Sequence, residues 1–266
     1  MKALVASRFG SPAEMTIEDR PMPSLKPGYS LVRIHAATVN PLSSQVRSGI
    51  VSGALAPLVL SNDGAGIVEE STLLKRGTRV AVYGGATLGI KEDGLQQQWA
   101  VIENNRLFEL PNNISLDEGA ALPINYVTAY QALTRVGQVK AGQRVLVSGA
   151  SGALGHALIQ TALALGAVPI GIVSSTPKVS SAHHSGAAVV IDLSRDVLKD
   201  AVFAATEGKG ADLAFDPVGG ELLGSMVAAL RARGALISIG FVGGMSASID
   251  VADLVIEEKR ILGYDA

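Results

Sequence analysis

Glycines three residues apart follow an apolar segment in the second half of the chain. Val145-Leu146-Val147 leads into Ser148-Gly149-Ala150-Ser151-Gly152-Ala153-Leu154-Gly155, and leucines and alanines then recur at helical spacing up to Gly166. Small residues in such a turn let backbone N–H groups approach a phosphate, and the dipole of the next helix favours its negative charge. A strand before the turn and a helix after it are typical of dinucleotide binding, whereas glycines alone also serve simple turns.

Hydroxyl and ammonium groups follow the next apolar segment. A unit of this kind that binds NAD usually carries an acidic residue roughly 20 positions after the glycine turn, where it holds the ribose 2′-hydroxyl. That place reads Ser174-Ser175-Thr176-Pro177-Lys178. These serines and Lys178 suit a 2′-phosphate, which a carboxylate would repel. The sequence therefore predicts NADPH rather than NADH as the cofactor; the alternative is that Lys178 is a solvated residue at a helix start.

Cysteine is absent from the 266 residues, and there are four histidines. Disulfides, thiolate nucleophiles and zinc sites built on sulfur are thereby excluded. His35 is expected in a strand, His156 in the helix after the glycine turn, and His183 and His184 on different faces of a helix. We expect structural roles for all four and no metal site.

The two halves of the chain differ in the elements that would position these residues. Short strands and turns precede residue 115, whereas apolar strands alternate with helix-length segments after it, beginning at the capping box Ser115-Leu116-Asp117-Glu118. We predict an α/β protein with a β-rich domain at 1–115 and a Rossmann-type domain, a doubly wound parallel sheet, at 116–266. Its six strands are expected at Arg144–Ser148, Pro169–Val173, Ala188–Ile191, Leu213–Phe215, Ala235–Ile239 and Ile261–Gly263.

Charge and hydropathy point to a small-molecule ligand. The net charge is -2, so no basic field would attract nucleic acid or an anionic membrane. The apolar stretch 157–173 is divided by Gly166, Pro169 and Gly171, which favours a buried helix and strand over a membrane span. The N-terminal apolar run is too short for a signal peptide, so a cytoplasmic location is expected.

Matches to a known pattern fall along nearly the whole chain. They are Val39-Asn40-Pro41, Arg47-Ser48-Gly49, Asp63-Gly64-Ala65-Gly66-Ile67-Val68-Glu69, Leu122–Leu133, the glycine turn and Asp216-Pro217-Val218-Gly219-Gly220. Together they resemble the zinc-independent quinone oxidoreductase family of the medium-chain dehydrogenase/reductase superfamily. The resemblance implies a GroES-like first domain and a cleft between the domains that holds the nicotinamide. A homodimer is one oligomeric state that it allows.

The resemblance also assigns site residues. It places Asn40 beside the nicotinamide and substrate, Thr128 at the carboxamide end and Gly240-Phe241 at the strand end near the nicotinamide. The remaining matches are to the pyrophosphate turn (Ser151, Gly152, Ala153 and Leu154) and to the 2′-phosphate site (Ser175 and Lys178, next to Ser174). In zinc-bearing relatives, a cysteine replaces Asn40 and a His-Glu pair replaces Asn62-Asp63, so zinc-dependent alcohol oxidation is not expected.

Several positions depart from the family pattern. Ser43 replaces an aspartate, Thr78 replaces the aspartate of Gly-Asp-Arg-Val, Ile50-Val51 replaces a tyrosine, and Leu193 stands where an aromatic often occurs. Family members also continue beyond the position of Tyr264-Asp265-Ala266 with a segment that returns to the first domain.

The activity expected from these features is hydride transfer from NADPH to a quinone or conjugated enone without zinc. Hydride addition to such acceptors gives a delocalised oxyanion, and Asn40 is the candidate hydrogen-bond donor to it. The alternative role of Asn40 is to hold the Val39-Asn40-Pro41 turn. Two other functions remain open: reduction of an enoyl thioester, and a NADPH-binding sensor or structural protein with little turnover.

Overall fold

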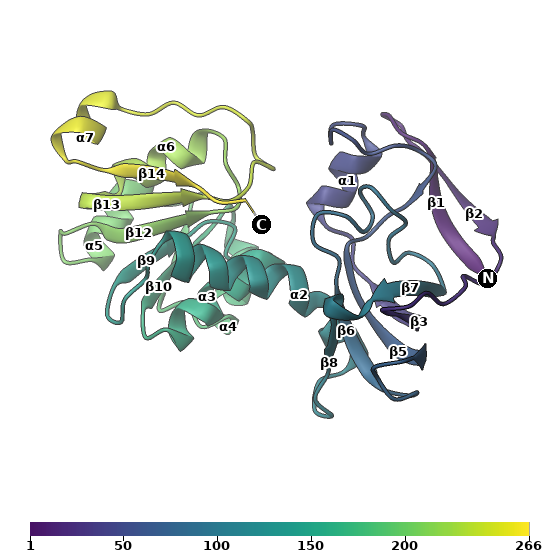
Figure 1. Ribbon diagram of the computed structural model, residues 1–266. Helices are drawn as coiled ribbons and strands as arrows, with labels where there is room; N and C mark the ends of the chain where they lie inside the picture. Colours follow the sequence, from purple (N-terminus) through teal and green to yellow (C-terminus); the bar gives the residue numbers. More distant parts are fainter. Residues whose placement is uncertain (266) are drawn as a thin grey trace. The chain divides into compact units, whose positions relative to one another are not determined.

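The computed structural model describes residues 1–265 and divides into two compact units, Met1–Ile124 and Asn125–Ala266 (Figure 1). The predicted capping box forms: Ser115 N donates to Glu118 Oε2, and Glu118 N donates to Ser115 Oγ. It starts helix α2 (Leu116–Gln131). The compact units therefore divide inside α2, whereas the boundary predicted at residue 115 coincides with the start of that helix.

The first unit is built from two antiparallel arrangements of strands. A five-stranded sheet has the order β7-β3-β5-β6-β8, and a smaller sheet has the order β2-β1-β4. One short helix, α1 (Pro41–Arg47), follows β3. The strands are β1 (Lys2–Arg8), β2 (Glu14–Asp19), β3 (Tyr29–Ala37), β4 (Leu58–Val59), β5 (Asp63–Ser71), β6 (Arg79–Tyr83), β7 (Trp99–Glu103) and β8 (Leu107–Glu109).

Strand β5 needs its glycines because β3 lies very close to it. A Cβ atom on Gly64 would lie 2.5 Å from the Ala36 carbonyl oxygen, and one on Gly66 would lie 2.3 Å from the Arg33 carbonyl oxygen. Larger residues would push the two strands apart. The glycines therefore allow Asp63, at the start of β5, to approach the end of β3.

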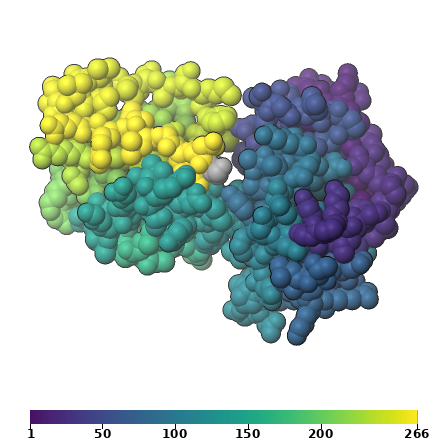
Figure 2. Space-filling model, viewed as in Figure 1, coloured from purple at the N-terminus to yellow at the C-terminus, as the bar shows by residue number. Residues whose placement is uncertain are grey.

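The second unit contains one six-stranded parallel sheet with the order β11-β10-β9-β12-β13-β14. This confirms the predicted Rossmann-type sheet. Its strands are β9 (Arg144–Val147), β10 (Val168–Val173), β11 (Val189–Asp192), β12 (Ala211–Asp216), β13 (Leu230–Ser238) and β14 (Arg260–Gly263). In the all-atom view of Figure 2, the C-terminal residues of this unit, in yellow, form part of its surface.

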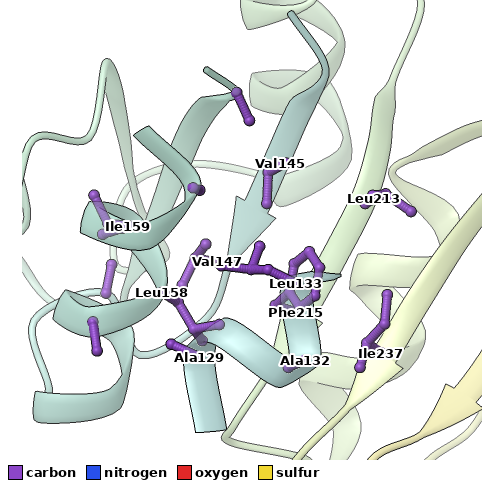
Figure 3. Close-up of a cluster of buried hydrophobic side chains, with 14 of the residues drawn as sticks. Ala129, Ala132, Leu133, Val145, Val147, Leu158, Ile159, Leu213, Phe215 and Ile237 are labelled. Carbon is purple, nitrogen blue, oxygen red and sulfur yellow. The ribbon is translucent and has the colours of Figure 1, made fainter. Parts of the chain in front are cut away.

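Helices cover both faces of this sheet, as the alternation of side chains along each strand requires. Val147, Phe215 and Ile237 point to one face and pack with Leu133 and Leu158 from the α2 and α3 regions (Figure 3). Leu146, Ala214 and Leu236 point to the other face, where α5 and α6 pack. The remaining helices are α3 (Ala153–Ala164), α4 (Val179–His184), α5 (Leu198–Ala205), α6 (Glu221–Ala228) and α7 (Val251–Ile256).

The main differences from the sequence prediction concern the strands of the first unit and strand ends. The sequence predicts strands there at 2–6, 29–37, 66–69 and 79–83, whereas strands β2, β4, β7 and β8 and helix α1 were not predicted. Strand β13 starts at Leu230, five residues before its predicted start, because it includes the polar segment 231–234. Within residues 1–265, no helix is long and apolar enough to cross a membrane.

Candidate functional site

The turn after β9 assigns a different role to each of its glycines. Gly149 has φ +58°, a left-handed conformation, and a Cβ atom on Gly155 would lie 2.1 Å from the Gly149 carbonyl oxygen. Both are therefore required by the turn itself. Gly152 has φ −90°, is exposed, and a Cβ atom there would lie 3.3 Å from its nearest neighbour, the Gly149 carbonyl oxygen. The backbone conformation at position 152 therefore does not require glycine. What distinguishes this glycine is that it leaves the surface of the turn open to solvent.

Helix α3 begins directly at this turn and presents backbone donors. The N–H groups of Ala153, Leu154 and Gly155 precede the first intrahelical donor, His156 N, which donates to the Gly152 carbonyl at 2.8 Å. Together with the helix dipole, they favour an anion at this end. The predicted residues Ser151, Gly152, Ala153 and Leu154 are thus contiguous at one anion-binding terminus.

The end of β10 carries the predicted phosphate-recognition group. Lys178 Nζ donates to Ser174 Oγ at 2.8 Å, and Ser175 lies between them in extended conformation. Lys178 is exposed, and its partner is a neutral hydroxyl rather than a carboxylate. The ammonium group therefore keeps its charge available for an anionic ligand.

A carboxylate that the sequence prediction did not consider lies at the end of the adjacent strand β11. Asp192 Oδ2 accepts from Thr176 Oγ1 at 2.5 Å, and its Oδ1 accepts from Ser194 N at 3.0 Å and Ser194 Oγ at 2.6 Å. Hydrogen bonds from Ser194, then Thr176, lower the pKa of Asp192 below its ordinary value. The carboxylate is therefore ionised and joins its own loop, through Ser194, to the segment after β10, through Thr176. Its place at a strand end was the signal that could have found it.

Asp216, at the end of β12, links two loops of the carboxyl edge. Its Oδ1 accepts from Ser148 Oγ at 2.5 Å, from Val218 N at 3.0 Å and from Gly219 N at 3.1 Å. The side chain is fully buried, and its Oδ2 has no hydrogen-bond partner among the described residues. One carboxylate therefore holds the turn after β12 to the strand that leads into the glycine turn.

A pocket of about 620 Å³ lies at the carboxyl ends of β12, β13 and β14. The predicted residues Gly240 and Phe241 line it, opposite the Gly219-Gly220 turn. Gly219 has φ +72° and a Cβ atom there would lie 2.8 Å from the Gly240 carbonyl oxygen, so glycine is needed for this close approach. The pocket is also lined by Leu223, Ser238, Ile239, the segment 244–247 and the segment 263–265.

These groups follow the carboxyl edge of the sheet in strand order. The residues predicted to bind a 2′-phosphate lie at the end of β10, the glycine turn at β9, Asp216 at β12 and the pocket at β13. The chain order reverses between β9 and β12, which is the topological switch point where ligands of such sheets bind. Open Gly152, the donors at the start of α3, an exposed ammonium that is not paired with a carboxylate and a pocket at the far end fit an extended dinucleotide. Thr128, which is buried in α2 of the same unit, was predicted at the carboxamide end and stays a prediction.

In the first unit, Asn40 belongs to a hydrogen-bonded cluster at the end of β3. Asn40 Nδ2 lies 2.9 Å from Asp63 Oδ1, 3.0 Å from Thr38 Oγ1 and 3.5 Å from Asn62 Oδ1. The Thr38 hydroxyl also donates to Asp63 Oδ1. Although Asn40 is the N-cap residue of α1, its side chain does not cap that helix. Its amide thus has two hydrogens for three nearby acceptors, and a donor role toward substrate requires one of these contacts to be released.

Asp63 is the buried centre of this cluster. Burial raises the pKa of its carboxyl group, and hydrogen bonds from Thr38, the Ile124 backbone and Asn40 oppose part of that rise. The sequence prediction treated Asp63 as part of the family-matching segment 63–69 and as a replacement for a glutamate of zinc-bearing relatives, and gave it no role at the site. The structure shows that it orients the Asn40 amide.

No group of three or more His, Asp or Glu side chains that could hold a metal ion occurs within residues 1–265. His35 lies 3.3 Å from Asp117, and His156 Nδ1 lies 2.8 Å from Ser185 Oγ. His183 and His184 contact the Ala187 and Ser180 carbonyl groups, respectively. Each histidine therefore has a local structural partner.

Comparisons with known proteins agree with this architecture. Residues 26–112 match the alcohol dehydrogenase GroES-like domain, and residues 153–266 match the zinc-binding dehydrogenase domain; Ala266 lies outside the described residues. The quinone oxidoreductase of Rattus norvegicus is 30% identical over 269 residues, which cover 99% of this chain and 79% of that protein.

Solved structures share the complete arrangement. An NAD-dependent alcohol dehydrogenase is 27% identical with a TM-score of 0.90, over 99% of this chain and 84% of that one. A mycobacterial protein in complex with NADPH is 25% identical with a TM-score of 0.87, over 100% of this chain and 82% of that one. The GroES-like and parallel-sheet units, joined in this order, and the similarity to the rat enzyme show that the chain belongs to the quinone oxidoreductase family of the medium-chain dehydrogenase/reductase superfamily.

Proposed function

We propose that the protein is an NADPH-dependent reductase that transfers hydride to a quinone or a conjugated enone without zinc. The observation that carries the cofactor preference is the end of β10, where the Lys178 ammonium is paired with the Ser174 hydroxyl and not with a carboxylate. The carboxylate at the end of the adjacent strand β11, Asp192, accepts hydrogen bonds from Thr176 and Ser194 on its two oxygens. The quinone or enone acceptor is supported by the family to which the chain belongs.

The second unit would hold the dinucleotide through groups along one sheet edge. The N–H groups at the start of α3 bind the pyrophosphate, and Ser174, Ser175 and Lys178 bind the 2′-phosphate. Gly240 and Phe241 border the pocket that takes the nicotinamide end. The bound cofactor supplies the hydride, and the protein supplies its position and its electrostatic surroundings.

The first unit would contribute the polar group nearest the acceptor. Hydride addition to a quinone or enone leaves charge on an oxygen, and a single amide hydrogen directed at that oxygen stabilises it. Asn40 can provide this hydrogen if one hydrogen of its amide group stays bound to Asp63 Oδ1 and the other is released from Thr38 Oγ1 and turns toward the acceptor. Neither step requires a metal ion.

Oxidation of NADPH and of NADH in the presence of quinones, conjugated enones and enoyl thioesters tests the proposal. We expect turnover of quinones or enones with a preference for NADPH. Preference for NADH, or turnover of enoyl thioesters alone, would contradict it. Tight binding of NADPH without turnover of any acceptor would instead support the sensor or structural function.

A further inference from the structure

A second pocket lies at the opposite, amino-terminal edge of the sheet in the second unit. It has a volume of about 290 Å³, and four separate segments line it: the connection from α2 to β9 and the starts of β12, β13 and β14. Strands of six residues, such as β12, place the two edges roughly 20 Å apart. The pocket is therefore distinct from the proposed cofactor site.

Cations dominate the lining of this amino-edge pocket. Lys140, Arg231, Arg233 and Arg260 line it, against the single carboxylate of Asp212. Asp212 is already engaged, because its Oδ1 accepts from Arg231 Nε at 2.7 Å and its Oδ2 accepts from Arg144 N at 2.8 Å. This carboxylate therefore offsets the charge of Arg231, and the other three cations of the lining exceed the negative charge of the pocket.

Two of the four cations lack a protein partner. Across residues 1–265, neither the Arg260 guanidinium nor the Lys140 ammonium makes a side-chain hydrogen bond or ion pair. Of the neighbouring glutamates, Glu258 pairs with Arg233 of the same pocket at 2.6 Å, and Glu207 pairs with Arg144 and Lys209, so neither pairs with Arg260 or Lys140. Arg260 and Lys140 are therefore available to a ligand.

The backbone at Arg233 adds an independent observation. Arg233 has φ +62°, a left-handed conformation that disfavours side chains with a Cβ atom and that glycine adopts without strain. Its backbone N–H donates to the Glu257 carbonyl at 2.7 Å, a contact that glycine would also make. Backbone geometry alone favours glycine here, whereas the guanidinium that is present pairs with Glu258 through Nε and lines the pocket.

We propose that the amino-edge pocket binds a small polyanion, with the unpaired Arg260 and Lys140 as ligands and with Arg233 contributing the guanidinium nitrogens that do not pair with Glu258. A phosphate-bearing anion and a di- or tricarboxylate share the required chemistry, since guanidinium groups pair with the oxygens of both. The volume accommodates an anion of that size. This proposal is independent of the reductase function.

Isothermal titration with inorganic pyrophosphate and, separately, with citrate tests it on the full chain at constant ionic strength. The titrations are made with and without saturating NADPH, because phosphate also suits the proposed cofactor site. The informative variants are Arg260→Gln and Arg233→Gly. Glycine adopts the φ of +62° at position 233 without strain, and Arg233→Gly removes only an exposed ion pair. The melting temperature of this variant should therefore not fall below that of the wild type.

We expect at least one of the two anions to bind the wild type in the presence of NADPH, and each of these variants to bind it about tenfold more weakly. Lys178→Gln, which removes a cation from the other edge, and Arg8→Gln, an exposed arginine of the first unit, should bind as the wild type does. Absence of binding, equal weakening in all four variants, or loss in Lys178→Gln alone would overturn the proposal. Binding of only one anion would identify which of the two chemistries the pocket takes.

Discussion

Lys178 is the residue that should decide the choice of nicotinamide nucleotide. Lys178→Ala should raise the Kd for NADPH by roughly tenfold or more, because a hydrogen bond to a charged group contributes roughly 1.5–3 kcal/mol. The Kd for NADH should change little. Fluorescence titration of the nicotinamide measures both, with Lys199→Ala on α5 as the matched exposed lysine. Equal losses for the two nucleotides would contradict a role at the 2′-phosphate.

Gly152 and Gly155 should respond to substitution in opposite ways. Gly152→Asp should leave a folded protein that no longer binds the cofactor, because position 152 has φ −90° and is exposed, while a carboxylate there would repel the pyrophosphate. Gly155→Ala should instead lower stability, because its Cβ atom would lie 2.1 Å from the Gly149 carbonyl oxygen. Thermal melts with and without NADPH separate the two effects. A destabilised Gly152→Asp protein whose melt still rises with NADPH would refute the assignment.

Asp63 should make stability depend on pH. Burial raises its pKa above the ordinary 3.8, so between the two values the folded protein binds more protons than the unfolded chain. Stability contributed by this group is then greatest below pH 3.8 and falls as pH rises through the raised pKa. The melting temperature of the wild type minus that of Asp63→Asn should therefore decrease toward neutral pH, whereas a difference that is constant or increases would show that the pKa is not raised.

At the scale of elements, α3 holds the glycine turn by one buried face. Leu158 is fully buried against the sheet, whereas Leu163 on the same helix is 42% exposed. Leu158→Ala should lower the free energy of unfolding by about 2–5 kcal/mol, and Leu163→Ala should change it far less. Chemical denaturation of both variants measures this. Similar losses would mean that α3 is not anchored by this face.

The apolar parallel strands and the glycine turn could be predicted because burial on both faces gives continuous apolar segments, and because the turn requires small residues at fixed spacing. Strand β2 could not, since Met15 and Ile17, although they alternate with polar residues, are its only apolar side chains and none of its residues is buried. The start of β13 was missed for the same reason, because Arg231 and Arg233 interrupt the apolar pattern.

The sequence motifs identify candidate site residues, but they do not identify the side chains to which such residues are hydrogen-bonded. Gly152, Lys178 and Asn40 follow from local sequence and family resemblance. The contacts of Asp63 with Asn40 and of Asp216 with Ser148 join positions 23 and 68 residues apart, respectively. Such pairs depend on sheet order and register, which no local pattern specifies. Those contacts are what determine the direction of the Asn40 amide and the position of the loop after β12.

At the scale of the whole molecule, two units each carry their own apolar core and their own polar groups. Neither unit contains, within the described residues, a cluster of side chains suited to a metal ion. Prolonged chelation should therefore leave NADPH binding, reductase activity and the melting temperature unchanged. Metal content measured by mass spectrometry provides the control. A stoichiometric zinc ion whose removal abolishes turnover would contradict the zinc-free mechanism.

The position of β9 in the sheet has a consequence for how the protein acquires its structure. One neighbour of β9, the strand β10, follows it closely in the chain, but the other, β12, is separated from it by the long connection that the Ser148–Asp216 hydrogen bond closes across 68 residues. During synthesis, β9 therefore leaves the ribosome with one edge unpaired until β12 has followed. Pairing between strands far apart in the sequence slows folding. Until β12 pairs with it, the apolar edge of β9 is exposed and prone to aggregation. The central strand of the sheet is thus also the part of the nascent chain that most needs protection.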